Sequence, residues 1–195
     1  MTQKRDIEAT RAALLGAAKE LMTGCADSDE VTSRAIAAKA GVNLAMINYC
    51  YGSREGLLYE VFKQLLSDAQ NASPGLAELL CSGIPPKERV IRLHFGMMKL
   101  MIANFNYSKA ITKYILLNRT DGAGMESLPC ITEHFAGKKT EEECRLISFE
   151  LSSLHELAVL RHKELKELCG IDLTDDRVLE DYVRTSVGRF LGGCD

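Results

Sequence analysis

The sequence has 195 residues and a formal net charge of −3, so it is long enough to form one or two small domains with a buried core. Hydrophobic residues make up 46% of it, and the absence of Trp, the 4 Pro and the abundant Ala, Leu, Glu and Lys favour an all-α protein. The charge balance excludes binding to nucleic acid through a bulk basic surface, since even residues 1–56 carry 7 basic and 7 acidic side chains. A DNA-binding function therefore needs a specific motif.

The 7 cysteines, at positions 25, 50, 81, 130, 144, 169 and 194, show neither a CxxC pair nor a zinc-like spacing with histidine. We interpret them as reduced thiols of a cytoplasmic protein, and a redox role for one of them stays open. Lys99, Lys109 and Lys113 interrupt the most hydrophobic stretches, so no run of residues is long enough to span a bilayer. We expect no membrane contact, no metal and no cofactor.

Apolar side chains that recur at three- and four-residue steps predict a series of helices. In chain order we expect them over residues 5–23, 32–40, 43–51, 54–72, 75–82, 86–104, 107–119, 140–169 and 174–191. Thr32 and Ser53 are suitable N-caps, and Thr140 with Glu143 has the spacing of a capping box. Residues 120–139, with 3 Gly and 1 Pro, predict an irregular connection that holds at most one short helical turn.

Residues 33–52, SRAIAAKAGVNLAMINYCYG, have the pattern of a helix-turn-helix. Two short helices that cross closely need a small residue in the first one, here Ala37, and a residue that tolerates positive φ four positions later, here Gly41. Apolar residues then fall on the buried faces, and an outward face is left to Leu44, Ala45, Met46, Asn48 and Tyr49. Such a face can enter a major groove, although a plain α-hairpin with a Gly turn also fits these twenty residues.

Segments on both sides of this motif extend it into a longer pattern. They are LMTG at 21–24, VT at 31–32, IA at 36–37, AGVN at 40–43, INYCY at 47–51 and GSREGLL at 52–58. In order and spacing, residues 7–62 resemble the DNA-binding domain of the TetR (tetracycline-repressor-like) family of transcriptional regulators. The resemblance implies an all-α fold, with a three-helix helix-turn-helix domain over residues 1–56 and a helical ligand-binding and dimerisation domain over residues 57–195.

The resemblance also implies a set of DNA contacts on double-stranded operator DNA. Thr32 and Ser33, at a helix N-terminus, would hold a phosphate through hydroxyl and backbone N–H groups. Tyr49, Ser53 and Arg54 would do so on the other side of the groove, while the residues between face the bases. The full predicted set is Thr32, Ser33, Asn43, Leu44, Ala45, Met46, Asn48, Tyr49, Ser53 and Arg54.

Two positions depart from the family pattern. Many members have His where this chain has Cys50, and often Phe where it has Tyr51. A thiol is a weak hydrogen-bond donor, so Cys50 would be a poor phosphate ligand, and we interpret it as a residue that packs inside.

For the C-terminal part, the resemblance implies that the helices over 140–170 and 174–192 pair with their copies in a four-helix dimer interface. We expect this interface of a homodimer at Leu151, Leu154, Ala158, Tyr182, Val183 and Val187. A monomeric bundle would give the same apolar spacing, but a palindromic operator favours the dimer.

The resemblance further implies that the helices over 86–119 surround a cavity for an apolar small-molecule effector, which would act by shifting the dimer between two geometries. We expect its lining at His94, Phe95, Met98, Met101, Phe105, Tyr114 and His155, although residues of these types are more often satisfied core or surface residues than ligand contacts. The alternative is a regulator without an effector, controlled by a protein partner or constitutive. A helical enzyme is a third hypothesis, but the histidines and cysteines show no nucleophile–base spacing, and we expect no catalysis.

Overall fold

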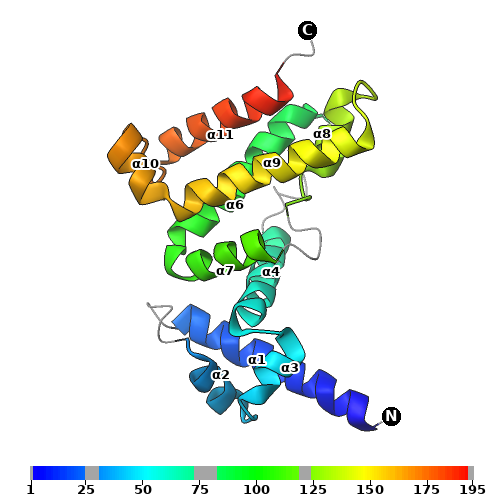
Figure 1. Ribbon diagram of the computed structural model, residues 1–195, viewed down its shortest axis with the longest axis vertical. Coiled ribbons are helices and arrows are strands. Elements are labelled where there is room, and N and C mark those ends of the chain that lie inside the picture. Colours follow the sequence, from blue (N-terminus) through cyan, green and yellow to red (C-terminus); the bar gives the residue numbers. More distant parts are fainter. Residues whose placement is uncertain (1, 25–30, 73–82, 119–123, 193–195) are drawn as a thin grey trace. The chain divides into compact units, whose positions relative to one another are not determined.

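A computed structural model describes residues 2–24, 31–72, 83–118 and 124–192, and in these ranges the chain is all-helical (Figure 1). The all-α prediction is therefore confirmed. The chain divides into two compact units, Met1–Ala72 with Asn106–Ile115, and Ser73–Phe105 with Leu116–Asp195. The boundary predicted at residue 56 lies inside helix α4 (Arg54–Ala72), all of which belongs to the first unit. The helix predicted over 75–82 lies outside the described residues.

The first unit contains α1 (Thr2–Gly24), α2 (Ser33–Ala40), α3 (Ala45–Tyr51), α4 and most of α7 (Phe105–Leu117). Helix α1 packs against α2, α3 and α4. Each helix contributes apolar side chains that are 1% exposed or less, among them Leu14, Ile36, Ile47, Leu57 and Leu58. Burying a leucine or isoleucine contributes roughly 1.5–3 kcal/mol, so this small core holds short helices that would not persist alone.

The second unit contains α6 (Pro86–Ala103), α8 (Leu128–Phe135), α9 (Glu141–Leu160), α10 (His162–Cys169) and α11 (Asp176–Leu191). Helix α6 is its centre, because it packs against α8, α9 and α11. Val90, Leu151, Val183 and Val187 are fully buried at these contacts. Within the described ranges, no helix combines the length and the apolar composition needed to cross a membrane.

Helix α8 lies in the segment that was predicted to be irregular, and that prediction is wrong. Pro129 is in the first turn of α8, where a helix tolerates proline because the first N–H groups have no intrahelical partner. Cys130, Ile131 and Phe135 are buried at helical spacing. Residues 120–123 of the same segment lie outside the described residues.

The single helix predicted over 140–169 is broken at Arg161, which separates α9 from α10 with φ −110° and ψ 22°. After the break the ring of His162 is buried. Its Nδ1 donates to the carbonyl oxygen of Val159 at 2.9 Å, and its centroid lies 4.3 Å from that of the Phe105 ring. Burial of His162 therefore accompanies the change of helix direction.

Helices α9 and α11 begin at side-chain caps. The predicted capping box is confirmed, since Thr140 Oγ1 accepts from the N–H of Glu143 at 3.2 Å and the Glu143 carboxylate accepts from the N–H of Thr140 at 2.8 Å. Helix α11 starts later than predicted, because the Asp175 carboxylate accepts from the N–H groups of Arg177 and Val178 at 2.8 and 3.3 Å. Both caps satisfy amides that have no partner inside the helix.

A chain of hydrogen bonds crosses the core of the second unit. Nδ1 of His94 on α6 lies 2.8 Å from Nδ1 of His155 on α9, and Nε2 of His155 lies 2.6 Å from the hydroxyl of Ser186 on α11. In the other direction, Nε2 of His94 lies 3.2 Å from the Ser127 hydroxyl, which lies 3.3 Å from that of Ser148. All five side chains are buried.

The donors and acceptors of this chain can be assigned in order. Ser186 Oγ donates to the carbonyl oxygen of Val183 at 3.0 Å, so it accepts the hydrogen of His155 Nε2. His155 Nδ1 is then an acceptor, and the hydrogen between the two rings belongs to His94 Nδ1. His94 Nε2 accepts from the Ser127 hydroxyl. This assignment takes both imidazoles as neutral, which burial favours because it lowers both pKa values, and it gives all four ring nitrogens a partner.

We expect the free energy of unfolding to fall as the pH drops through the range in which these histidines are protonated only in the unfolded chain. Burial lowers the pKa of His94 from 6.5 to about 4, and burial together with the neighbouring His94 lowers the pKa of His155 to about 2. Between pH 6.5 and about 4 the unfolded chain binds more protons than the folded one, so stability rises with pH. Each histidine then contributes a slope of up to about 1.4 kcal/mol per pH unit.

Urea unfolding at several pH values across this window, with wild type and His155→Asn, measures that slope. The variant should have a smaller slope than wild type by about 1.4 kcal/mol per pH unit, since one histidine no longer contributes. The substitution His134→Asn, at a half-buried histidine of α8, is the matched control. Equal slopes in wild type and His155→Asn would contradict the assignment of a neutral buried pair.

Candidate nucleic-acid interface

The first turn of α2 places polar groups at the surface of the first unit. Thr32 caps the helix, because its hydroxyl oxygen accepts from the N–H of Ala35 at 3.1 Å. This leaves the Thr32 hydroxyl hydrogen and the first amides of α2 able to donate outward. Ser33 is half-buried, and Arg34 beside it is exposed and forms no ion pair with any described residue. Arg34 is not among the predicted DNA contacts, although its place directly after Thr32 and Ser33 in the sequence is a signal for one.

The turn between α2 and α3 has the geometry that the sequence predicted. Gly41 has φ +67°, in the left-handed region, and a Cβ there would meet no atom within 4 Å, so the backbone conformation alone favours glycine. The N–H groups of Gly41 and Val42 donate to the carbonyl oxygens of Ala38 and Ala37 at 3.2 and 3.1 Å. These two backbone hydrogen bonds end α2 and set the direction of the next helix.

Helix α3 begins with a side-chain turn. The carboxamide oxygen of Asn43 accepts from the N–H of Ala45 at 2.8 Å, while Leu44, at the N-cap position, makes no side-chain cap. Asn43 therefore organises the start of α3, and its oxygen is already engaged. Met46, the third residue of this turn, is half-buried.

The two faces of α3 differ in burial as predicted. Ile47 and Cys50 are 1% and 6% exposed, so the interpretation of Cys50 as a packed residue is confirmed. On the other face Leu44 is 45% and Tyr49 67% exposed, and Asn48 is exposed between them. A seven-residue helix that leaves this much apolar and aromatic surface in water offers a binding surface rather than a core face.

Two of the residues predicted to contact DNA, Ser53 and Arg54, lie at the start of α4. The hydroxyl oxygen of Ser53 accepts from the N–H of Gly56 at 2.9 Å and caps the helix, which leaves the hydroxyl hydrogen able to donate. Arg54 keeps 25% of its side chain exposed and has a guanidinium nitrogen 3.6 Å from the carboxylate of Glu55. Its charge lies next to the exposed face of α3 in sequence but is partly neutralised.

Other cations of the first unit are also paired. Lys19 lies 2.6 Å from the carboxylate of Asp68, and Lys39 lies 2.9 Å from that of Glu20. This pairing agrees with the even charge balance of the N-terminal residues. Arg34, which has no ion pair within the described part of the first unit, can bind phosphate without first losing a described carboxylate partner.

The residues predicted to line a ligand cavity are distributed over both units. His94, Met98, Met101 and His155 are buried in the second unit, where the two histidines bond to each other. Tyr114 belongs to the first unit, and its ring centroid lies 6.0 Å from that of Tyr59. Phe95 and Phe105 are half-buried in the second unit. The two histidines expected to orient a ligand therefore already bond to each other.

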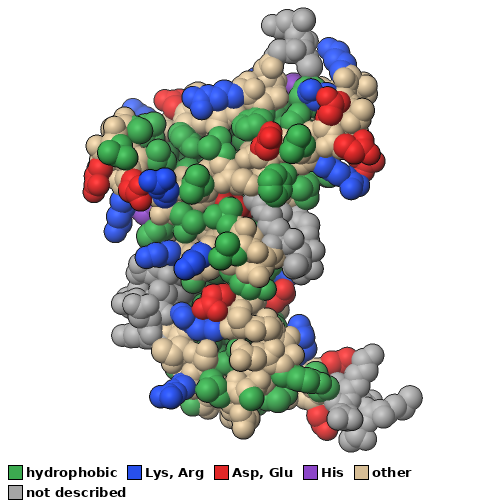
Figure 2. Space-filling view, viewed as in Figure 1, with side chains coloured by type: hydrophobic (Ala, Val, Ile, Leu, Met, Phe, Trp, Pro, Cys, Tyr) green, Lys and Arg blue, Asp and Glu red, His purple; other side chains and the backbone are tan. Residues whose placement is uncertain are grey.

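Four residues predicted at a dimer interface are buried within one copy. Leu151, Val183 and Val187 are 0% exposed and Ala158 is 4% exposed, because these positions face α6 and the core of the second unit. The neighbouring positions are the exposed ones: Leu146, Phe149 and Leu157 on α9 and Leu168 on α10 are between 45% and 79% exposed. Hydrophobic side chains gather over α9 and α10 on the face seen in Figure 2.

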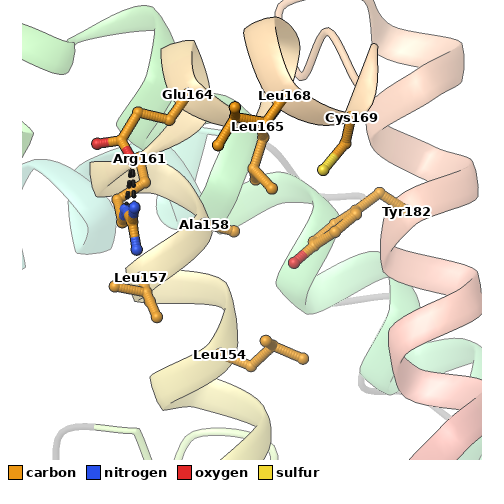
Figure 3. A pocket seen from close by; sticks show the side chains of 9 residues that line it. All are labelled: Leu154, Leu157, Ala158, Arg161, Glu164, Leu165, Leu168, Cys169 and Tyr182. Atoms are coloured by element: carbon orange, nitrogen blue, oxygen red, sulfur yellow. Dashed lines mark hydrogen bonds and ion pairs between the residues drawn. The ribbon is translucent and has the colours of Figure 1, made fainter.

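The other two residues predicted at that interface line a groove of about 210 Å³ between α9, α10 and α11 (Figure 3). Tyr182 of α11 points across it toward α9, and the Arg161–Glu164 ion pair lies at its edge. Its walls are Leu154, Leu157, Ala158, Arg161, Glu164, Leu165, Leu168, Cys169 and Tyr182. Most of these are apolar, so the groove extends the exposed apolar face of α9.

No protein-family model and no curated protein matches the chain. Among solved structures, the chain is similar to a TetR transcriptional regulator from Rhodococcus sp. RHA1, with 17% identity, a TM-score of 0.59 and coverage of 100% of both chains. It is also similar to a TetR-like transcriptional regulator from Rhodococcus sp. RHA1, with 20% identity, a TM-score of 0.49 and coverage of 94% of this chain and 96% of that one. The first likeness shows that the chain has the fold of a TetR transcriptional regulator over its full length.

Proposed function

We propose that this protein is a sequence-specific transcriptional regulator that binds a palindromic DNA operator as a homodimer. The exposed face of α3 is the observation that carries the proposal. Leu44, Asn48 and Tyr49 leave an apolar and hydrogen-bonding surface in water, on a helix whose opposite face is buried. Such a helix fits the major groove, where bases present both methyl groups and hydrogen-bonding edges.

The chemistry of this face divides between base and phosphate contacts. The carboxamide of Asn48 can pair with the N6 and N7 edge of adenine, and the small Ala45 lets the helix come close to the bases. The Tyr49 hydroxyl can donate to a phosphate. Arg34, beside the N-terminal amides of α2, and Arg54 at the start of α4 supply the positive charge.

We expect Asn48→Ala and Tyr49→Ala to weaken operator binding by about 10- to 100-fold, because each removes a contact at the protein–DNA boundary. Arg54→Ala should weaken binding to all duplexes alike and lower the slope of log affinity against log salt by about one, since one phosphate contact is lost. The measurement is fluorescence anisotropy over a salt series, on a duplex selected by the wild-type protein from a random-sequence library.

Arg145→Ala is the charge-matched control, because Arg145 pairs with Glu141 on α9 at 2.5 Å and lies outside the first unit. It should leave both affinity and salt slope unchanged. Circular dichroism must show that all variants keep the helical content of wild type. The proposal would be contradicted if the wild-type protein enriched no duplex. It would also be contradicted if all three variants bound with the affinity of wild type.

The dimer of this proposal forms through the exposed apolar face of α9 and α10. Leu146, Phe149 and Leu157 lie on one side of α9, and Leu168 of α10 is 79% exposed beside the groove. A protruding leucine next to an apolar groove is a self-complementary arrangement, which a two-fold axis can use twice. The second copy would cover these side chains, and the pair would carry two α3 helices, one for each half of a palindromic operator.

We expect Leu157→Asp to convert the dimer to a monomer, because the substitution places a carboxylate where apolar surface would be buried. Leu117→Asp is the matched control, since Leu117 is 73% exposed at the end of α7, away from α9 and α10 in sequence. Sedimentation velocity of wild type and both variants at equal concentration measures the association state. A dimer that persists in Leu157→Asp would exclude this face as the interface.

Two buried hydroxyls of α7 support a ligand-responsive regulator. Ser108 and Thr112 are 0% exposed, lie one turn apart on the same side of the helix, and have no hydrogen-bond partner for their hydroxyl oxygens among the residues that the structure describes. Leaving a hydroxyl unpaired in the core costs about 1–3 kcal/mol, and a bound effector with one polar group would remove that cost. The closed pairing of His94 and His155 instead favours the alternative, a regulator without a small-molecule effector.

We expect Thr112→Val to raise the free energy of unfolding by about 1 kcal/mol in the absence of ligand, because it removes an unpaired hydroxyl and keeps the shape. Thermal denaturation of wild type and Thr112→Val, each with a library of apolar compounds, distinguishes a ligand-responsive regulator from an effector-free one. An effector should stabilise wild type more than Thr112→Val, while Thr132→Val, at an exposed threonine of α8, should respond like wild type. A DNA-binding protein that no compound stabilises would favour the effector-free regulator.

A further inference from the structure

The C-terminal end of α3 is fixed to α1 by three contacts between two residues and their neighbours. Arg11 Nη1 donates to the carbonyl oxygen of Cys50 at 2.5 Å. The Arg11 guanidinium carbon lies 4.6 Å from the centroid of the Tyr51 ring, and the Tyr51 hydroxyl donates to the carbonyl oxygen of Arg11 at 2.7 Å. The two residues thus bind each other reciprocally, and we call this arrangement the Arg11–Tyr51 clasp.

Helix α4 holds Tyr51 from another direction. A Cβ added to Gly56, in the first turn of α4, would lie 2.4 Å from the carbonyl oxygen of Tyr51, so the two backbones approach as closely as glycine permits. The hydroxyl of Tyr51 therefore contacts α1 while its carbonyl faces α4. Burial raises the pKa of Tyr51, which keeps the phenol protonated and able to donate.

The other restraints on α3 are its buried inner face, at Ile47 and Cys50, and the Asn43 side chain at its start. The helix has seven residues, too few to be stable in isolation, and its N-cap position makes no side-chain bond. A guanidinium that donates to one of the last carbonyls of a helix forms a charge-assisted bond and interacts favourably with the negative end of the helix dipole. Asn48 and Tyr49, the exposed residues, directly precede Cys50, so the orientation of their side chains depends on how this end is held.

We propose that Arg11 and Tyr51 are positioning residues for DNA recognition, which fix the angle of the exposed face of α3 without touching DNA. This inference rests on the proposed function. Phe at position 51, which many members of the resembling family have, would keep the ring under Arg11 but lack the hydroxyl that bonds to α1. The clasp is therefore a property of this chain's own Arg11 and Tyr51.

The test uses the full-length protein with Arg11→Gln, Arg11→Lys and Tyr51→Phe, and Lys19→Gln as a control that removes one positive charge elsewhere on α1. Hydrogen exchange measured without DNA should show faster exchange of the α3 amides in Arg11→Gln and Tyr51→Phe. The amides of α6 should not change. Because this readout needs no DNA, it tests the clasp even where the proposed function fails.

Binding to the duplex selected by wild type supplies the second readout. Arg11→Gln and Tyr51→Phe should weaken affinity by about 3- to 10-fold with no change in salt slope, and Arg11→Lys, which can still donate to Cys50, should recover part of the loss. Lys19→Gln should stay within about twofold of wild type. Tyr51→Phe keeps the aromatic ring and loses only the hydroxyl, so its result is decisive if Arg11→Gln loses helical content.

Two results would overturn the proposal. A salt slope lowered by about one in Arg11→Gln would identify Arg11 as a phosphate ligand rather than a positioning residue. Unchanged exchange and unchanged affinity in both Arg11→Gln and Tyr51→Phe would show that the clasp restrains nothing. A wild-type protein that enriches no duplex would remove the proposed function instead, with the exchange data still reporting on the clasp.

Discussion

A helix of seven residues cannot hold its own shape in water, and the structure of the first unit follows from that constraint. Helix α3 must keep one face exposed, so all of its stability comes from the other face and from its two ends. Ile47 and Cys50 bury the inner face, Asn43 organises the entry, and the last turn is held by Arg11 of α1. Close packing at Gly56 then leaves the exposed face little freedom to rotate.

In the second unit, polar side chains are buried between three packed helices. His94, His155 and Ser186 come from α6, α9 and α11, and each would be costly to bury alone. Arranged in one donor–acceptor order, they satisfy one another and keep both imidazoles neutral. Such a network ties the three helices together at neutral pH, and it depends on every member being present.

The surface of the second unit carries the opposite feature, apolar side chains left in water. Leu157 and Leu168, both exposed, line a groove together with Tyr182 and Leu154. Core residues of the second unit, such as Leu151 and Val183, are already buried against α6. The outer side of α9 and α10 is thus still free to contact a partner copy, and the proposed dimer uses it.

The sequence by itself determined the all-helical fold, the caps at Thr32, Ser53 and Thr140, the turn at Gly41 and the division of α3 into a buried and an exposed face. These features depend on residues a few positions apart, so local spacing and backbone conformation suffice to predict them. The tertiary structure alone decided the break at Arg161, the helix α8, the pairing of His94 with His155 and the contact of Arg11 with Tyr51. Helical spacing shows that a side chain such as Leu151 is buried but not which neighbour covers it. That choice is made by contacts between residues far apart in the chain.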